Sequence, residues 1–256
     1  MPRANRYYTY GNIWHITHRC HKKDFLLKFK IDRLCWIQWL FEAKKRFGIT
    51  ILNYIVTSNH IHLLVSDNSS EGNIPKFMQL LQSRTAQEYN NRKNRKGAFW
   101  EDRYHATAIE SDDHLIQCMV YINLNMVRAG VVKHPVRWKE SGYYEIAFPK
   151  KRYALINYNS LLQLLNIRSI DQLQTYQRQW IKDKLDSNTL KREGKWTEAI
   201  AVGNPPFLEK IKEQLNILAK SRRITKSDNG FELSETEIPY KIIFDTKNTQ
   251  ISPKKH

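Results

Sequence analysis

The sequence predicts an α+β fold, with a ferredoxin-like antiparallel sheet, helices on one face and an added tyrosine-bearing helix, followed by a small helical C-terminal region. Three observations support this class. Segments rich in β-branched and aromatic residues alternate with segments of helical periodicity in the order β-α-β-β-α-β. One more amphipathic helix follows them, and only helical patterns recur after Pro149. This order leaves the second face of the sheet for a ligand or for the extra helix.

Local signals set the bounds of the expected elements. Gly48 ends the first helix, Pro75 occupies the first turn of the second, and Ser111 is a candidate N-cap for the third, which Gly130 ends. The expected strands are 12–18, 49–56, 60–65 and 103–109, and the expected helices are 24–47, 75–89 and 111–129.

The C-terminal part has a different character. Helical patterns at 158–167, 169–185 and 206–218 suggest a small accessory unit. The last residues are polar and charged, so we expect a loosely ordered tail. The predicted divisions are 1–150, 151–220 and 221–256.

Composition excludes several classes of protein. No stretch approaches the roughly 18 apolar residues of a membrane span, and the N-terminus lacks the apolar core of a secretory signal. The three cysteines are too far apart for a Cys-x-x-Cys zinc site, which favours a reducing, cytoplasmic location. The net charge of +17 is spread over both halves of the chain, and 12% of residues are aromatic. Basic residues with aromatic side chains are typical of single-strand nucleic-acid binding, although a basic protein with an aromatic core has the same composition.

A histidine pair lies on one expected strand. His60 and His62 point to one face because side chains alternate along a strand, while Ile61, Leu63 and Val65 point to the other. Two imidazoles projecting from a rigid strand are able to chelate a divalent metal. Two ordinary surface histidines would give the same pattern.

The helix expected at 111–129 carries an unusual polar stripe. At about 100° per residue one face is apolar. The opposite face holds residues that suit chemistry better than solvation, namely His114, Gln117, Tyr121, Asn125 and Arg128. The phenol of Tyr121 is able to attack a phosphodiester if a metal polarises the phosphate. Asn125 would then be a third metal ligand, and Arg128 would pair with a phosphate or with a structural carboxylate.

These residues resemble a known family. The motif from His60 to His62, followed by the run Tyr121-Ile-Asn-Leu-Asn-Met-Val-Arg-Ala-Gly130, is similar to the HUH-type single-tyrosine transposases. The similarity is closest to the REP-associated tyrosine transposase branch and covers roughly residues 1–145, so 1–150 is identified as the transposase/nuclease domain.

The resemblance implies a mechanism and a substrate. Tyr121 would cleave single-stranded DNA at hairpin (REP-like) repeats of a bacterial chromosome, giving a 5′-phosphotyrosine intermediate, and strands would then be rejoined in DNA transposition or recombination. Mg²⁺ or Mn²⁺ would be held by His60, His62 and Asn125. We expect a nucleoid-associated monomer, with a dimer as the alternative. A non-catalytic regulator that binds DNA or RNA hairpins is the alternative function.

Basic and aromatic residues near the expected site are candidates for DNA contacts. An ordinary solvated charge run is the other interpretation of the loop at 90–97. The candidates are Arg19, Lys93, Arg95, Lys96, Arg103, Tyr104 and Arg128.

Overall fold

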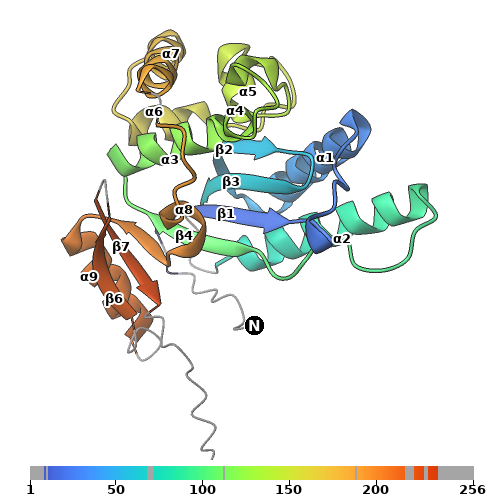
Figure 1. Cartoon of the computed structure of the whole chain (residues 1–256), viewed down its shortest axis with the longest axis horizontal. Coiled ribbons are helices and arrows are strands. Elements are labelled where there is room, and N and C mark those ends of the chain that lie inside the picture. The colour runs from blue at the N-terminus through green and yellow to red at the C-terminus, as the bar shows by residue number, and fades with distance from the viewer. Residues whose placement is uncertain are drawn as a thin grey trace, which may run out of the picture.

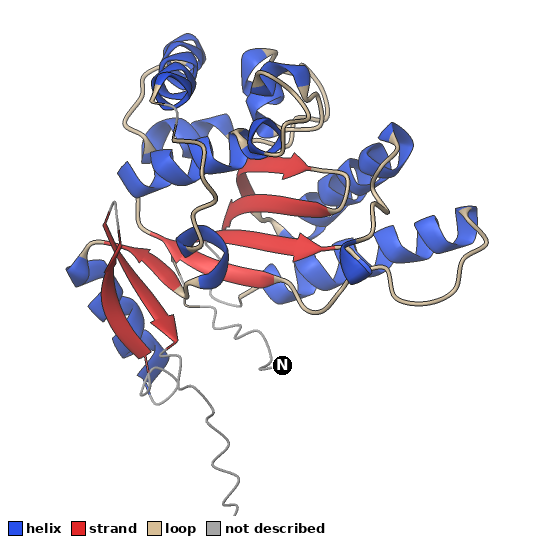
Figure 2. Ribbon diagram, viewed as in Figure 1, coloured by secondary structure: helices blue, strands red, loops and turns tan. Residues whose placement is uncertain are grey.

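A single seven-stranded sheet organises the chain (Figures 1 and 2). The computed structural model describes residues 9, 11–67, 72–111, 113–187, 189–216, 222–227 and 230–235. The strands are β1 (Ile13–Arg19), β2 (Thr50–Val56), β3 (His60–Ser66), β4 (His105–Ile109), β5 (Ala201–Gly203), β6 (Arg222–Ser227) and β7 (Gly230–Glu235), in the spatial order β2-β3-β1-β4-β5-β7-β6. The helices are α1 (Lys30–Phe47), α2 (Ile74–Arg92), α3 (Asp113–Asn123), α4 (Asn125–Arg128), α5 (Gly142–Ala147), α6 (Tyr158–Leu164), α7 (Ile170–Asp186), α8 (Lys195–Glu198) and α9 (Pro205–Leu215), with short 3-10 turns η1 (His21–Lys23) and η2 (Pro135–Arg137).

The predicted α+β class is confirmed, and its four N-terminal strands pair antiparallel. Helices α1 and α2 pack against each other and bury Trp36, Leu40, Phe77 and Leu81. Figure 1 shows this helix pair together at one side of the sheet, away from α3. Helix α3 packs against β2 and β4 instead, while α8 contacts β1 and β4. The added helix therefore takes up the place that the element order leaves open.

The C-terminal region differs from the expected set of helices. Beside α6, α7 and α9 it contributes β5, which pairs parallel with β4, and the β6–β7 hairpin, which extends the same sheet. The sequence conceals these strands because β5 has only three residues and β6 is charged, as edge strands often are. The part of the expected tail beyond residue 235 lies outside the described residues.

A buried carboxylate attaches the start of this region to the sheet. Glu145 is fully buried and accepts hydrogen bonds from the hydroxyl of Tyr54 (2.9 Å) and from the backbone N–H groups of Leu155 (2.7 Å) and Ile156 (2.9 Å). The two N–H groups donate to Oε1, while the Tyr54 hydroxyl donates to Oε2, from which the ammonium of Lys150 lies 3.6 Å away. The segment leading to α6 is thus held against β2, where Asn157 also donates its N–H to the carbonyl of Ile51.

In the part of the chain that the structure describes, every helix is too short or too polar to cross a membrane.

Replacing Glu145 with alanine tests this attachment. We expect Glu145→Ala to lower the free energy of unfolding by about 3 kcal/mol, because it leaves two buried N–H groups and a buried hydroxyl without their acceptor. Urea unfolding followed by circular dichroism measures the change. The control is Glu209→Ala, which removes a surface ion pair between Glu209 and Lys212. We expect it to lower the free energy of unfolding by less than about 0.5 kcal/mol. Equal stability of the two variants would contradict the assigned role.

Candidate active site

The pairing of β1 with β3 brings two histidines together on one face of the sheet. His62 lies opposite Thr17 and His15 lies opposite Leu64, so the two imidazoles are diagonal neighbours. Nε2 of His15 lies 2.9 Å from Nδ1 of His62, and the rings are stacked with centroids 5.1 Å apart. Both side chains are buried. On the other side, Nδ1 of His15 lies 2.8 Å from the carbonyl oxygen of Trp196 in α8.

The first histidine of the motif, His60, is held by the hairpin turn that precedes it. Nδ1 of His60 lies 2.7 Å from Oδ1 of Asn59 and 3.0 Å from the hydroxyl oxygen of Thr57. The Thr57 hydroxyl also donates to the carbonyl of His60, which fixes the turn. The rings of His60 and His62 lie edge to face, 5.1 Å apart. The predicted shared face is therefore present.

Asn125 faces this pair from a break in the helix. The sequence suggests one continuous helix over 111–129, but the helical hydrogen-bond pattern is interrupted at Leu124 and resumes as α4. Nδ2 of Asn125 lies 2.9 Å from Nε2 of His62. At the interruption the carbonyl oxygen of Tyr121 accepts a hydrogen bond from the guanidinium of Arg128 (2.8 Å).

Tyr121 is buried among aromatic and cationic groups, with 5% of its surface exposed. Its ring centroid lies 5.8 Å from that of His62, 6.2 Å from that of His15 and 6.1 Å from that of Trp196. The guanidinium carbon of Arg128 lies 4.0 Å from the ring centre, a cation–π contact. Arg128 therefore orients the tyrosine in this conformation.

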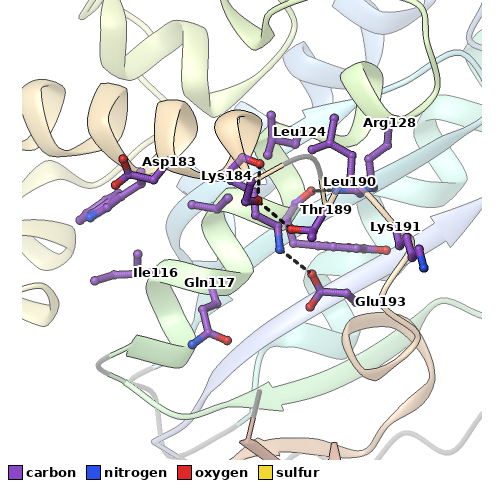
Figure 3. Close-up of a pocket in the computed structure, with 14 residues that line it drawn as sticks. Ile116, Gln117, Leu124, Arg128, Asp183, Lys184, Thr189, Leu190, Lys191 and Glu193 are labelled. Atoms are coloured by element: carbon purple, nitrogen blue, oxygen red, sulfur yellow. Dashed lines mark hydrogen bonds and ion pairs between the residues drawn. The ribbon is translucent and has the colours of Figure 1, made fainter. Parts of the chain in front are cut away.

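A cavity of about 370 Å³ opens beside Tyr121 between α3 and the C-terminal region (Figure 3). Gln117 and Arg128 line it from the tyrosine side, and Lys184, Lys191 and Glu193 line it from α7 and the segment that follows. Figure 3 shows Lys184 joined to Glu193 on this C-terminal side of the cavity, and their charged atoms lie 3.4 Å apart. The C-terminal region thus forms one wall of the candidate site.

Burial determines the protonation of the site. It lowers the pKa of His60 to about 4 and that of His15 to about 3, and it also lowers the pKa of His62. Nearby cations, including Arg128, act in the same direction on all three. The imidazoles are therefore neutral near pH 7, the form that ligates metals. Burial raises the pKa of the Tyr121 phenol, and the positive charges of Arg128 and Arg192 partly oppose this.

The donor set fits a divalent cation that prefers oxygen and imidazole ligands. Among the described residues, no three His, Cys, Asp or Glu side chains are grouped as a metal site. A cation held by His60 and His62 would thus take its remaining ligands from the Asn125 carboxamide, from water or from a substrate phosphate. Turning that carboxamide by 180° would present its oxygen, in place of its nitrogen, to such a cation. Mg²⁺ and Mn²⁺ suit such a set.

The candidate DNA-contact residues fall into two groups. Arg19 pairs with His60 across the β1–β3 ladder and, like Arg103, is exposed near the histidine end of the sheet. Lys93 and Lys96 are exposed in the loop after α2, and the ammonium of Lys93 lies 5.0 Å from the ring centre of Phe29, itself 55% exposed. These positions are open to a polyanion.

Two candidates do not fit direct DNA contact. Tyr104 is 1% exposed and its ring lies edge-on to that of His18, so it belongs to the core. Its place just before β4, beside charged residues, made it look accessible in the sequence. Arg95 binds Oδ1 of Asn90 (3.0 Å) and the carbonyl of Ala98 (2.9 Å), which makes it a brace of the loop.

Sequence reasoning missed two parts of the site, His15 and the segment from Glu193 to Trp196. The His15 imidazole was visible as a polar residue on an apolar strand, but its partner depends on strand register. The Trp196 carbonyl carries no sequence signal at all.

The fold and the site together define a class. A histidine pair on a central strand, facing a helix-borne tyrosine across a ferredoxin-like sheet, is the arrangement expected of HUH-type single-tyrosine transposases. The family model described as "Transposase IS200 like" matches residues 9–125, which include both motif histidines, Tyr121 and Asn125. Over this segment, a little under half of the chain, the resemblance is confirmed.

One solved structure shares the fold. The chain is similar to a structure described as "Structure of the REP associates tyrosine transposase bound to a REP hairpin", with 18% sequence identity, a TM-score of 0.51, and coverage of 58% of this chain and 87% of the other. A second similar structure, from Deinococcus radiodurans R1 and provisionally described as a transposase, has 16% identity, a TM-score of 0.34, and coverage of 45% and 90%. No functionally curated protein matched the chain.

The lowered histidine pKa values predict an acid-sensitive fold. A histidine that is neutral in the folded protein but titrates near 6.5 when unfolded stabilises the fold above pH 6.5, and this stability is lost as the pH falls towards about 4. We therefore expect the free energy of unfolding, measured in EDTA, to decrease from pH 7 to pH 4.5. His60→Gln should flatten this dependence. An unchanged slope in the variant would contradict a neutral, buried His60.

Proposed function

We propose that this protein is a metal-dependent enzyme that nicks and rejoins single-stranded DNA at hairpin repeats through Tyr121. The observation that carries the proposal is the convergence of His60, His62, Asn125 and Tyr121, from two separate parts of the chain, on one face of the sheet. A structural core has no need of two neutral imidazoles and a carboxamide around a tyrosine.

The chain's own residues account for the transfer step. The Tyr121 oxygen forms a bond to the phosphorus of a phosphodiester while the bond to the 3′ oxygen breaks, and the proton lost by the phenol is balanced by the one gained by the 3′-hydroxyl. One phosphodiester replaces another, so a 3′-hydroxyl can reverse the step without external energy. Arg128 fixes the ring and its backbone carbonyl. The bound Mg²⁺ or Mn²⁺ would supply Lewis acidity to the phosphate.

Charge and the similar structure support a DNA hairpin as the substrate. The chain carries +17, and Arg19, Arg103, Lys93 and Lys96 are exposed around the histidine end of the sheet and the adjoining loop. Lys93 over the exposed ring of Phe29 combines phosphate pairing with a surface for base stacking. The similar transposase was solved with a REP hairpin. We propose that the protein acts as a monomer, with 1–150 as the nuclease domain and 151–235, whose strands continue the same sheet, as an accessory unit.

Removing the phenolic oxygen separates chemistry from binding. We expect Tyr121→Phe to abolish a covalent protein–DNA adduct on labelled single-stranded hairpins with Mn²⁺, while hairpin affinity stays within about 3-fold of wild type because phenylalanine keeps the ring contacts. Denaturing gels detect the adduct and filter binding measures the affinity. The matched control is Tyr176→Phe, which alters an exposed tyrosine on α7 and should leave the adduct intact.

Two results would contradict the proposal. An adduct that persists in Tyr121→Phe would exclude this nucleophile. Tight hairpin binding by the wild type, with no adduct in either Mn²⁺ or Mg²⁺, would instead indicate the non-catalytic hairpin-binding regulator, and RNA hairpins would then be tested beside DNA.

The loop lysines should act through phosphates. We expect the double variant Lys93→Ala/Lys96→Ala to weaken hairpin binding for all sequences alike. It should reduce the slope of log affinity against log salt by about 1–2, because each lost phosphate contact removes roughly 0.7–0.9. Binding titrations at several salt concentrations measure it. Lys210→Ala/Lys212→Ala on α9 removes the same charge far from the site, and an equal effect there would make the loop an ordinary solvated charge run.

A further inference from the structure

We propose that His15 is a positioning residue which, through the backbone carbonyl of Trp196, sets the tautomer of His62 so that His62 Nε2 is free to bind a metal ion. The inference rests on the proposed function, since it assigns a purpose to the geometry behind the metal-ligating pair. It also makes the C-terminal region, which lies beyond the matched segment 9–125, a part of the active site.

The hydrogen-bond chain can run in one direction only. A carbonyl oxygen accepts and never donates, so the Trp196 oxygen at 2.8 Å requires the proton of His15 to lie on Nδ1. A neutral imidazole has one N–H group, which leaves Nε2 of His15 as an acceptor. His62 must then donate from Nδ1 across the 2.9 Å contact, and its own Nε2 keeps the lone pair. Asn125 Nδ2 lies 2.9 Å from that Nε2, which is consistent with an accepting nitrogen.

The Trp196 carbonyl, where this series of hydrogen bonds begins, is held firmly in place. The Thr107 hydroxyl of β4 donates to the carbonyl of Ala199 at 2.7 Å and lies 3.4 Å from that of Trp196. The N–H of Ala108 donates to the carbonyl of Ile200, where β5 begins its pairing with β4. The Trp196 side chain is fully buried and its indole N–H donates to Glu193. The carbonyl therefore cannot turn away without breaking several contacts.

His60 reaches the same state by a local route. Its Nδ1 is held by the side chains of Asn59 and Thr57, so Nε2 is again the free nitrogen. His62 has no such turn beside it, because it lies within β3, and its Nδ1 points across the sheet to β1. His15 therefore accepts the Nδ1 proton of His62 in the way that Asn59 accepts the Nδ1 proton of His60. Partners of this kind typically change metal affinity 10–100-fold when they are removed.

The direct test is the tautomer itself. Long-range ¹H–¹⁵N correlation spectra of the metal-free, DNA-free full-length protein, labelled at histidine, distinguish Nδ1–H from Nε2–H imidazoles. We expect Nδ1–H for both His15 and His62, with His62→Gln providing the assignment of the His62 signals. An Nε2–H tautomer of His62 in the wild type would overturn the inference.

Metal affinity tests the consequence. We expect His15→Leu to weaken Mn²⁺ binding 10–100-fold, measured by calorimetry and by the electron paramagnetic resonance of free Mn²⁺. His15→Gln, whose side-chain carbonyl can still accept from His62, should recover most of the affinity. His105→Gln is the matched control, because His105 bonds the carbonyl of Ala199 on the same face but lies outside the chain of contacts, and it should stay within about 3-fold of wild type.

The outcomes separate this inference from the proposed function. If His15→Leu keeps the wild-type Mn²⁺ affinity while remaining folded, or if His15→Gln binds as weakly as His15→Leu, the inference is wrong even where the wild type forms DNA adducts. If the tautomers and the affinities are as expected but no adduct forms with any hairpin, the role of His15 is supported and the proposed strand transfer is wrong. A wild type that binds no Mn²⁺ overturns both.

Discussion

The antiparallel register of β1 with β3 is the constraint on which the candidate site depends. It places Thr17 opposite His62 and, two residues away, His15 diagonal to it on the same face. A shift of one residue would turn one of the two imidazoles to the opposite face, where Trp14 and Ile16 lie, because side chains alternate along a strand. The apolar residues of both strands fix the register through burial, so the core that stabilises the fold also aligns the chemistry.

The helix that carries Tyr121 packs over the same face of the sheet. Its apolar residues pack against the core, and the interruption at Leu124 turns Asn125 towards His62 while Arg128 occupies the carbonyl of Tyr121. Packing a phenol, three imidazoles and a guanidinium together in a buried space is unfavourable for a charged histidine. Burial lowers the pKa of these imidazoles and keeps them neutral. A histidine must be neutral in order to bind a metal ion.

The C-terminal region is joined to the first half rather than appended to it. β5 continues the sheet beyond β4, Glu145 fastens the segment before α6, and α8 delivers the Trp196 carbonyl to His15. The cavity beside Tyr121 has one wall from α3 and the other from α7 and the residues after it. A molecule that enters this cavity therefore contacts the C-terminal region as well as α3.

Local periodicity in the sequence is enough to predict the α+β class, the four N-terminal strands and the shared face of His60 and His62. It also indicated Tyr121 and Asn125, which are one helical turn apart. The partner of His62, the helix break and the burial of Tyr104 follow from long-range packing and cannot be predicted from local patterns. The same is true of the strands β5, β6 and β7. These features depend on strand register and on contacts between residues far apart in the chain, such as His15 with Trp196. The contact of His15 is with a backbone carbonyl, which every residue has, so no residue type in the sequence could indicate it.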